Sequence, residues 1–164
     1  MNQGSTSLDR LLELVRVDFA PEHRQPSWPR VLIASVVALV GSLAADAVIV
    51  AIGTRVFPAT KGYVHFQFSD YAKLTIIGVV VACAGWPIIT RISSAPRWIY
   101  FRLAILVTLV LLLPDLWILH GGAPGRAVAV LVVMHLAIAV VTYNSMVRIA
   151  RIRELRVVHA GAGS

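Results

Sequence analysis

Four titratable side chains stand inside long apolar stretches of the sequence: Asp46, Lys73, Asp115 and His135. Ionisable groups inside membrane segments are energetically costly and usually face the protein interior, so they mark candidate functional positions. Two acids, one base and one histidine at similar depth can form a compensated polar cluster. Such a cluster is suited to relaying protons or ions, or to holding the polar headgroup of a substrate.

A structural interpretation of the same four residues is also open. Asp46 would then pair with Lys73 and Asp115 with His135, and the two pairs would fix the register of the helices. Single polar contacts between membrane helices contribute only about 0.6 kcal/mol on average. Pairing of this kind would therefore specify geometry more than it would add stability.

The composition of the chain requires a membrane environment around these residues. Of the 164 residues 58% are hydrophobic and 14% are charged, and the mean hydropathy is +0.79. An average soluble domain is about 45–50% apolar and about 25% charged. The core of a soluble protein of this size cannot bury this excess of apolar residues. Intrinsic disorder is also excluded, because it requires low hydrophobicity. We therefore expect an integral membrane protein.

Four stretches are long and apolar enough to cross a bilayer, which takes about 20 residues. They are predicted at about 31–52, 71–89, 98–119 and 127–147. None shows the period-two alternation of an outer-membrane barrel strand. The sequence predicts an all-α membrane protein with a four-helix transmembrane bundle over 31–147, and a tight turn over 120–125 between the last two spans.

The distribution of basic residues predicts the orientation of the bundle. Of the fifteen Lys and Arg residues, eleven lie on the side of the two termini and of the loop between the second and third spans. The positive-inside rule therefore places both termini in the cytoplasm of a bacterial plasma membrane. The basic residues flank the apolar runs instead of forming one stripe, so we expect no nucleic-acid partner.

The segments outside the bundle carry two further candidate sites. Residues 1–30 are predicted to form a cytoplasmic amphipathic helix followed by a Pro-rich linker. The apolar face of that helix is a candidate partner-docking surface, and the same face could equally lie on lipid. It is made of Leu8, Leu11, Leu12, Val15 and Phe19. Residues 148–164 form a basic tail that is expected to continue the fourth helix. The tail contains four arginines that are candidates for contact with anionic lipid headgroups: Arg148, Arg151, Arg153 and Arg156.

Small residues indicate where helices approach closely. Ala34, Ala38, Ser42 and Ala45 follow one another at small-xxx-small spacing in the first span. Gly78 and Ala82 have the same spacing in the second span. Such stripes permit close contact between membrane helices.

Motifs of enzymes and of cofactor sites are missing from the sequence. It has no HExxH zinc motif, no Gly-x-Ser-x-Gly elbow and no Walker A lysine. The single cysteine, Cys83, excludes an internal disulfide framework and a Cys-based zinc cluster. We therefore expect no enzymatic activity, no cofactor and no bound metal.

The chain from Leu74 to Arg151 resembles a family of small four-span membrane proteins of unknown function, found mostly in actinobacteria. The resemblance is carried by several short segments, namely 74–79, 84–86, 101–103, 113–116, 129–131 and 134–135. It implies that Pro114-Asp115 and Met134-His135 belong to a shared pattern. No activity of that family is known that could be carried over to this chain.

Two functions follow from these observations. We favour an accessory or scaffolding subunit of a larger envelope complex, for lipid transport or cell-wall assembly, because the chain is small and offers a docking helix. The alternative is a small oligomeric transporter coupled to protons or ions through the intramembrane Asp, His and Lys residues. The expected partners are the lipid bilayer and either another membrane protein or further copies of the chain.

Overall fold

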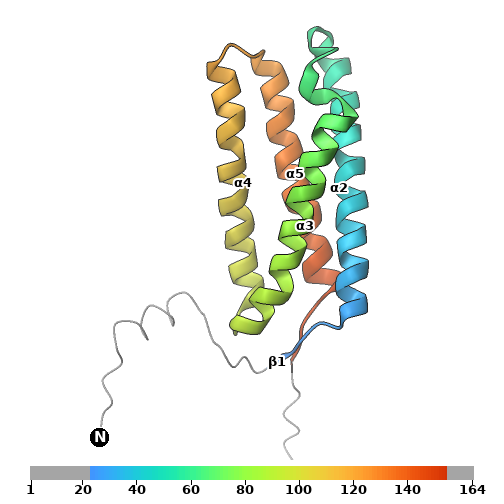
Figure 1. Cartoon of the computed structure of the whole chain (residues 1–164), viewed down its shortest axis with the longest axis vertical. Coiled ribbons are helices and arrows are strands. Elements are labelled where there is room, and N and C mark those ends of the chain that lie inside the picture. Colours follow the sequence, from blue (N-terminus) through green and yellow to red (C-terminus); the bar gives the residue numbers. More distant parts are fainter. Residues whose placement is uncertain (1–22, 155–164) are drawn as a thin grey trace, which may run out of the picture.

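A computed structural model describes residues 23–154 as four long helices joined by short connections (Figure 1). The helices are α2 (Trp28–Val56), α3 (Phe68–Ile92), α4 (Pro96–His120) and α5 (Gly125–Ile149). Each of these four is long and apolar enough to span a membrane. The all-α bundle is confirmed, and each predicted span lies within one helix that extends beyond it at both ends.

Proline and glycine set several of the helix ends. Pro29 and Pro96 lie in the first turns of α2 and α4, where the missing N–H has no helical acceptor in any case. Gly122, in the turn between α4 and α5, has a φ of 92° that favours glycine. The short turn predicted between the last two spans is therefore confirmed. The longer α2–α3 connection holds two 3-10 turns, η1 (Pro58–Thr60) and η2 (Val64–Phe66).

Neighbouring helices run antiparallel. Helix α2 packs most extensively against α5 and also against α3, and α4 packs mainly against α5. We call the end of the bundle that carries both chain ends of the described region the terminal end (Figure 1). The opposite end carries the α2–α3 and α4–α5 connections and is called the loop end.

The interior of the bundle holds two apolar clusters and a set of buried polar side chains. The loop-end cluster is apolar and consists of Phe66, Tyr71, Ala72, Ala127, Val130, Leu131 and Met134. The terminal-end cluster is also apolar and consists of Val31, Ala34, Ala38, Val79, Cys83, Trp86, Ile89, Tyr100, Met146 and Ala150. Each of the four helices also contributes buried polar side chains to the interior, and these include Ser42, Asp46, Thr75, Thr108, Asp115 and Thr142. Large aliphatic side chains cover the outside, as expected for a surface that faces lipid.

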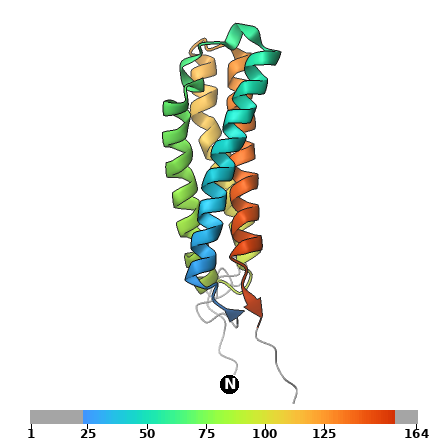
Figure 2. The ribbon, with the colours of Figure 1, turned by 90° about the vertical axis from the view of Figure 1, so that its right-hand side faces the viewer.

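Short strands hold the terminal end together. Strand β1 (His23–Arg24) pairs antiparallel with β2 (Arg153–Glu154), so both ends of the described chain lie side by side (Figure 2). The expectation that the tail continues the last helix is wrong over these residues. Helix α5 stops at Ile149, the Trp86 indole N–H donates to the Ala150 carbonyl at 2.8 Å, and the following backbone pairs with β1.

Candidate functional site

Asp46 lies on the buried face of α2, one and two turns after Ser42 and Ala38. Its side chain is fully buried, and its Oδ2 accepts a hydrogen bond of 2.7 Å from the Thr75 hydroxyl of α3. Within the described residues its Oδ1 has no hydrogen-bond partner. The carboxyl is therefore held by one donor on one oxygen and leaves the other oxygen free to accept.

Asp115 of α4 meets His135 of α5, as the sequence pattern predicted. The side chain of Asp115 is 8% exposed, and its Oδ2 lies 3.1 Å from the His135 Nδ1. The same nitrogen lies 3.0 Å from the Leu131 carbonyl, one turn earlier in α5. A single N–H at Nδ1 donates well to one acceptor at a time, and the geometry here favours the carbonyl. In the described chain Asp115 Oδ2 thus has an imidazole nitrogen close by but no hydrogen bond.

His135 contacts Asp115 and stands near Asp46 along the axis of the bundle. Gly41 lies against Val141 and Gly53 lies against Val130, so Asp46 on α2 stands level with the stretch of α5 around His135. We call Asp46, Thr75, Asp115 and His135 the carboxyl–imidazole cluster.

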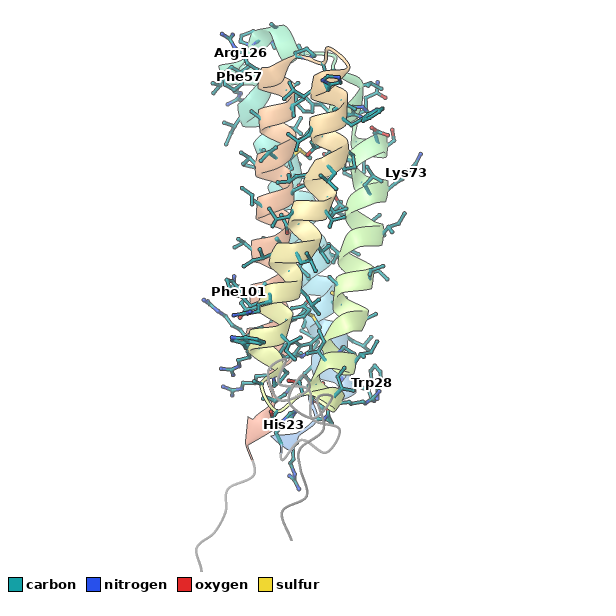
Figure 3. All side chains as sticks on the ribbon, turned by 90° about the vertical axis from the view of Figure 1, so that its left-hand side faces the viewer. His23, Trp28, Phe57, Lys73, Phe101 and Arg126 are labelled. Atoms are coloured by element: carbon teal, nitrogen blue, oxygen red, sulfur yellow. The ribbon has the colours of Figure 1, made fainter. Side chains whose placement is uncertain are left out.

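Lys73 is not part of this cluster, and the predicted Asp46–Lys73 pair is wrong. Its side chain is exposed and points away from the bundle (Figure 3). The reason is helical rotation: Thr75 faces Asp46, and a residue two positions earlier lies on roughly the opposite side of α3. Asp70, the acidic neighbour of Lys73 in the sequence, contacts His65 instead.

The α2–α3 connection lies at the loop end of the cluster. His65 Nδ1 and Asp70 Oδ2 are 2.7 Å apart, with side chains 40% and 42% exposed. The ring of Tyr63 packs edge-on against those of His65 and Phe66. Burial raises the pKa of the Tyr63 phenol, and the negative charge of Asp115 raises it further. The half-exposed His65–Asp70 pair therefore lies beside Tyr63, whose phenol is within electrostatic range of the Asp115 carboxyl.

The remaining candidate residues fall into two groups. The predicted docking residues Leu8, Leu11, Leu12, Val15 and Phe19, together with Arg156, lie outside the described residues. Arg148 and Arg151 are exposed at the terminal end and Arg153 lies in β2, so their contact with anionic lipid stays a prediction. Among the described residues no three His, Cys, Asp or Glu side chains are grouped to hold a metal ion.

The sequence pattern missed Thr75 and His65. A threonine in an apolar span is common, and only its place on the buried face of α3 reveals its role. His65 lies outside the spans, in η2, and its position two residues after Tyr63 and five before Asp70 gave no recognised motif.

Comparison with known proteins assigns the chain to one family. Residues 22–152 match the model of a family of unknown function, DUF6069, and the chain belongs to that family. No curated protein and no solved structure matches it significantly.

Proposed function

We propose that this member of the DUF6069 family is a proton-translocating protein of the bacterial plasma membrane, which binds and releases protons at the carboxyl–imidazole cluster. One observation carries the proposal. Asp46 and Asp115 come from different helices, are buried at neighbouring levels of the bundle, and each keeps one oxygen without a hydrogen-bond partner in the described chain. Side chains that served only to lock the helices together would be expected to use those acceptors.

The chemistry of the three titratable groups suits proton exchange. Histidine changes charge readily near neutral pH, and an ionised carboxyl in a membrane interior is costly. Moving a proton between His135 and a carboxyl changes two charges at once and leaves the net charge of the pair unchanged. His135 is placed to do this with Asp115, at 3.1 Å, and it stands near the level of Asp46 on α2.

Access to the cluster is proposed from the loop end. The half-exposed His65–Asp70 pair contacts solvent, its imidazole packs against the ring of Tyr63, and the Tyr63 phenol is within electrostatic range of Asp115. A proton would be taken up at this pair and passed to Asp115 and His135, then to Asp46. The positive-inside rule assigns the loop end to the outer face of the membrane, because the terminal end carries most of the arginines.

Proton flux into vesicles tests the proposal. The full chain is reconstituted into liposomes that contain a trapped pH-sensitive dye, and valinomycin is added to impose a potassium diffusion potential that is negative inside. We expect the wild type to acidify the lumen, and Asp46→Asn and His135→Ala to fall to the rate of protein-free vesicles. Asp46→Asn keeps an oxygen that accepts from Thr75, so its loss of flux would not reflect a lost hydrogen bond.

Lys73→Gln is the matched control, since it removes an ionisable group from the same end of the bundle but outside the cluster. It should retain the wild-type rate. Wild-type vesicles that are no faster than empty ones, or full flux in both cluster variants, would overturn the proposal.

The accessory-subunit hypothesis remains a separate prediction, because its docking helix lies outside the described residues. A pull-down from native membranes in mild detergent tests it with the variant Leu11→Asp. Release of a fixed-ratio partner by that substitution would support a subunit role. Unchanged co-purification would remove the docking segment from consideration.

A further inference from the structure

Two hydroxyl groups near the middle of the bundle are exceptional among its helical serines and threonines. Four other helical hydroxyls donate to the carbonyl one turn earlier in their own helix, and they belong to Ser35, Thr54, Thr108 and Ser145. Ser42 Oγ and Thr142 Oγ1 do not, and they have no hydrogen-bond partner in the described chain. Ser42 is fully buried and Thr142 is 4% exposed, so neither reaches solvent.

The two hydroxyls lie at one level. Gly41 on α2 is so close to α5 that a Cβ added there would stand 3.0 Å from Val141 Cγ1. Ser42 and Thr142 directly follow these two residues, and because α2 and α5 are antiparallel, Ser42 lies about 3 Å nearer the loop end than Thr142 along the axis. The orphan hydroxyls therefore flank one of the two close approaches of α2 to α5.

This level adjoins the carboxyl–imidazole cluster. Ser42 precedes Asp46 by four residues on the same face of α2, about 6 Å along the axis. Asp46 Oδ1 is the third orphan oxygen in this region. Unpartnered buried polar atoms are rare in native proteins, and ordered water making two to four hydrogen bonds is their usual partner.

We propose a buried water site between α2 and α5, bound by Ser42 Oγ and Thr142 Oγ1 and reaching Asp46 Oδ1. Water fits these groups because the two hydroxyls both donate and accept, and the carboxyl oxygen accepts. A sodium ion would need five or six oxygens around one point, and these oxygens are spread over a helical turn. The site rests on the proposed function in one respect: its water would receive the proton of Asp46 and carry it toward the terminal end.

Water-edited solid-state NMR of the labelled full chain in lipid bilayers tests the site. We expect the side-chain signals of Ser42 and Thr142 to receive magnetisation from water nearly as fast as Gly122 in the loop. Val40, which faces lipid at the same depth, should receive it at least several-fold more slowly. Signals of Ser42 and Thr142 as slow as that of Val40 would overturn the site.

Substitutions sharpen the test. The near-isosteric Thr142→Val should slow the transfer to Ser42 to the rate of Val40, whereas Ser145→Ala should leave it unchanged, because the Ser145 hydroxyl already donates to Val141. Retained transfer to Ser42 in Thr142→Val would contradict the shared site. Shifts of the Ser42 and Thr142 signals between sodium and choline buffers would identify a cation and overturn the assignment to water.

The NMR result is independent of the flux result. Transfer to Ser42 and Thr142 without any wild-type proton flux would refute the function and keep the water site. Proton flux that depends on Asp46, without transfer of magnetisation from water to Ser42 and Thr142, would support the function and refute the water site.

Discussion

Replacing Thr75 with valine removes the one side chain of the described chain that donates a hydrogen bond to Asp46. The two side chains are almost equal in shape, so the substitution deletes a hydrogen bond of 2.7 Å and leaves the packing in place. Polar contacts between membrane helices contribute about 0.6 kcal/mol on average and at most about 1.7. Hydrogen bonds to charged groups contribute about 1.5–3 kcal/mol.

The cost of Thr75→Val should lie where these ranges meet. Both residues are buried, and without Thr75 neither oxygen of Asp46 has a donor in the described chain. We expect the free energy of unfolding to fall by about 1.5 kcal/mol, which is about tenfold in the equilibrium constant. The assay is reversible unfolding in mixed micelles of dodecyl maltoside and dodecyl sulfate, followed by helical circular dichroism.

Two controls isolate the bond. Thr54→Val should cost less than about 0.5 kcal/mol, because the Thr54 hydroxyl donates within its own helix, to the Val50 carbonyl. In the background of Asp46→Ala, Thr75→Val should also cost less than about 0.5 kcal/mol, since no carboxyl is left without a donor. Equal costs in both backgrounds, or no measurable cost in the wild type, would refute the buried Asp46–Thr75 pair.

Two further predictions use the close helix contact and the loop-end phenol. Gly53→Ala should lower the free energy of unfolding by about 1–3 kcal/mol, because the added Cβ would stand 2.8 Å from Val130 Cγ2. Gly78→Ala, with open space around it, should raise the free energy of unfolding by about 0.5–1 kcal/mol. Equal effects of the two substitutions would contradict the close α2–α5 contact at Gly53. Asp115→Asn should lower the pKa of Tyr63 toward the ordinary tyrosine value without reaching it, since burial is the larger cause, and ultraviolet absorbance titration against the wild type measures the shift. An unchanged Tyr63 titration in Asp115→Asn would show that the charge of Asp115 does not act on Tyr63. Because the pKa is raised in the folded state, its contribution to stability is fully present below the ordinary tyrosine pKa and is lost as pH rises through the raised value.

The spans and the Asp115–His135 contact could be predicted from sequence because length, hydropathy and depth decide them. The two residues stand in successive antiparallel helices, Asp115 five residues before the end of α4 and His135 ten residues after the start of α5. The stripe of Ala34, Ala38 and Ser42 was also informative, since all three lie on the buried face of α2.

The partner of Asp46 could not be predicted because it depends on the rotation of α3 about its axis. In a soluble protein the apolar face of a helix fixes that rotation. In a membrane both lipid and core accept apolar side chains, so hydropathy leaves the rotation open. Lys73 and Thr75 were therefore equivalent by depth, and only packing places Thr75 inside and Lys73 outside. For the same reason Gly78, in a small-residue stripe, faces open space.

The exchange of protons by the buried carboxyls is tested most directly by infrared spectroscopy of the protein in supported bilayers while the pH of the bathing solution is stepped. Asp46→Asn and Asp115→Asn assign the bands. We predict that the C=O stretching band of protonated carboxyls changes intensity reversibly with pH, and that each substitution removes part of that change. A band that stays constant over the whole pH range in which the helices remain folded, or that changes equally in both variants and the wild type, would contradict proton exchange at Asp46 and Asp115.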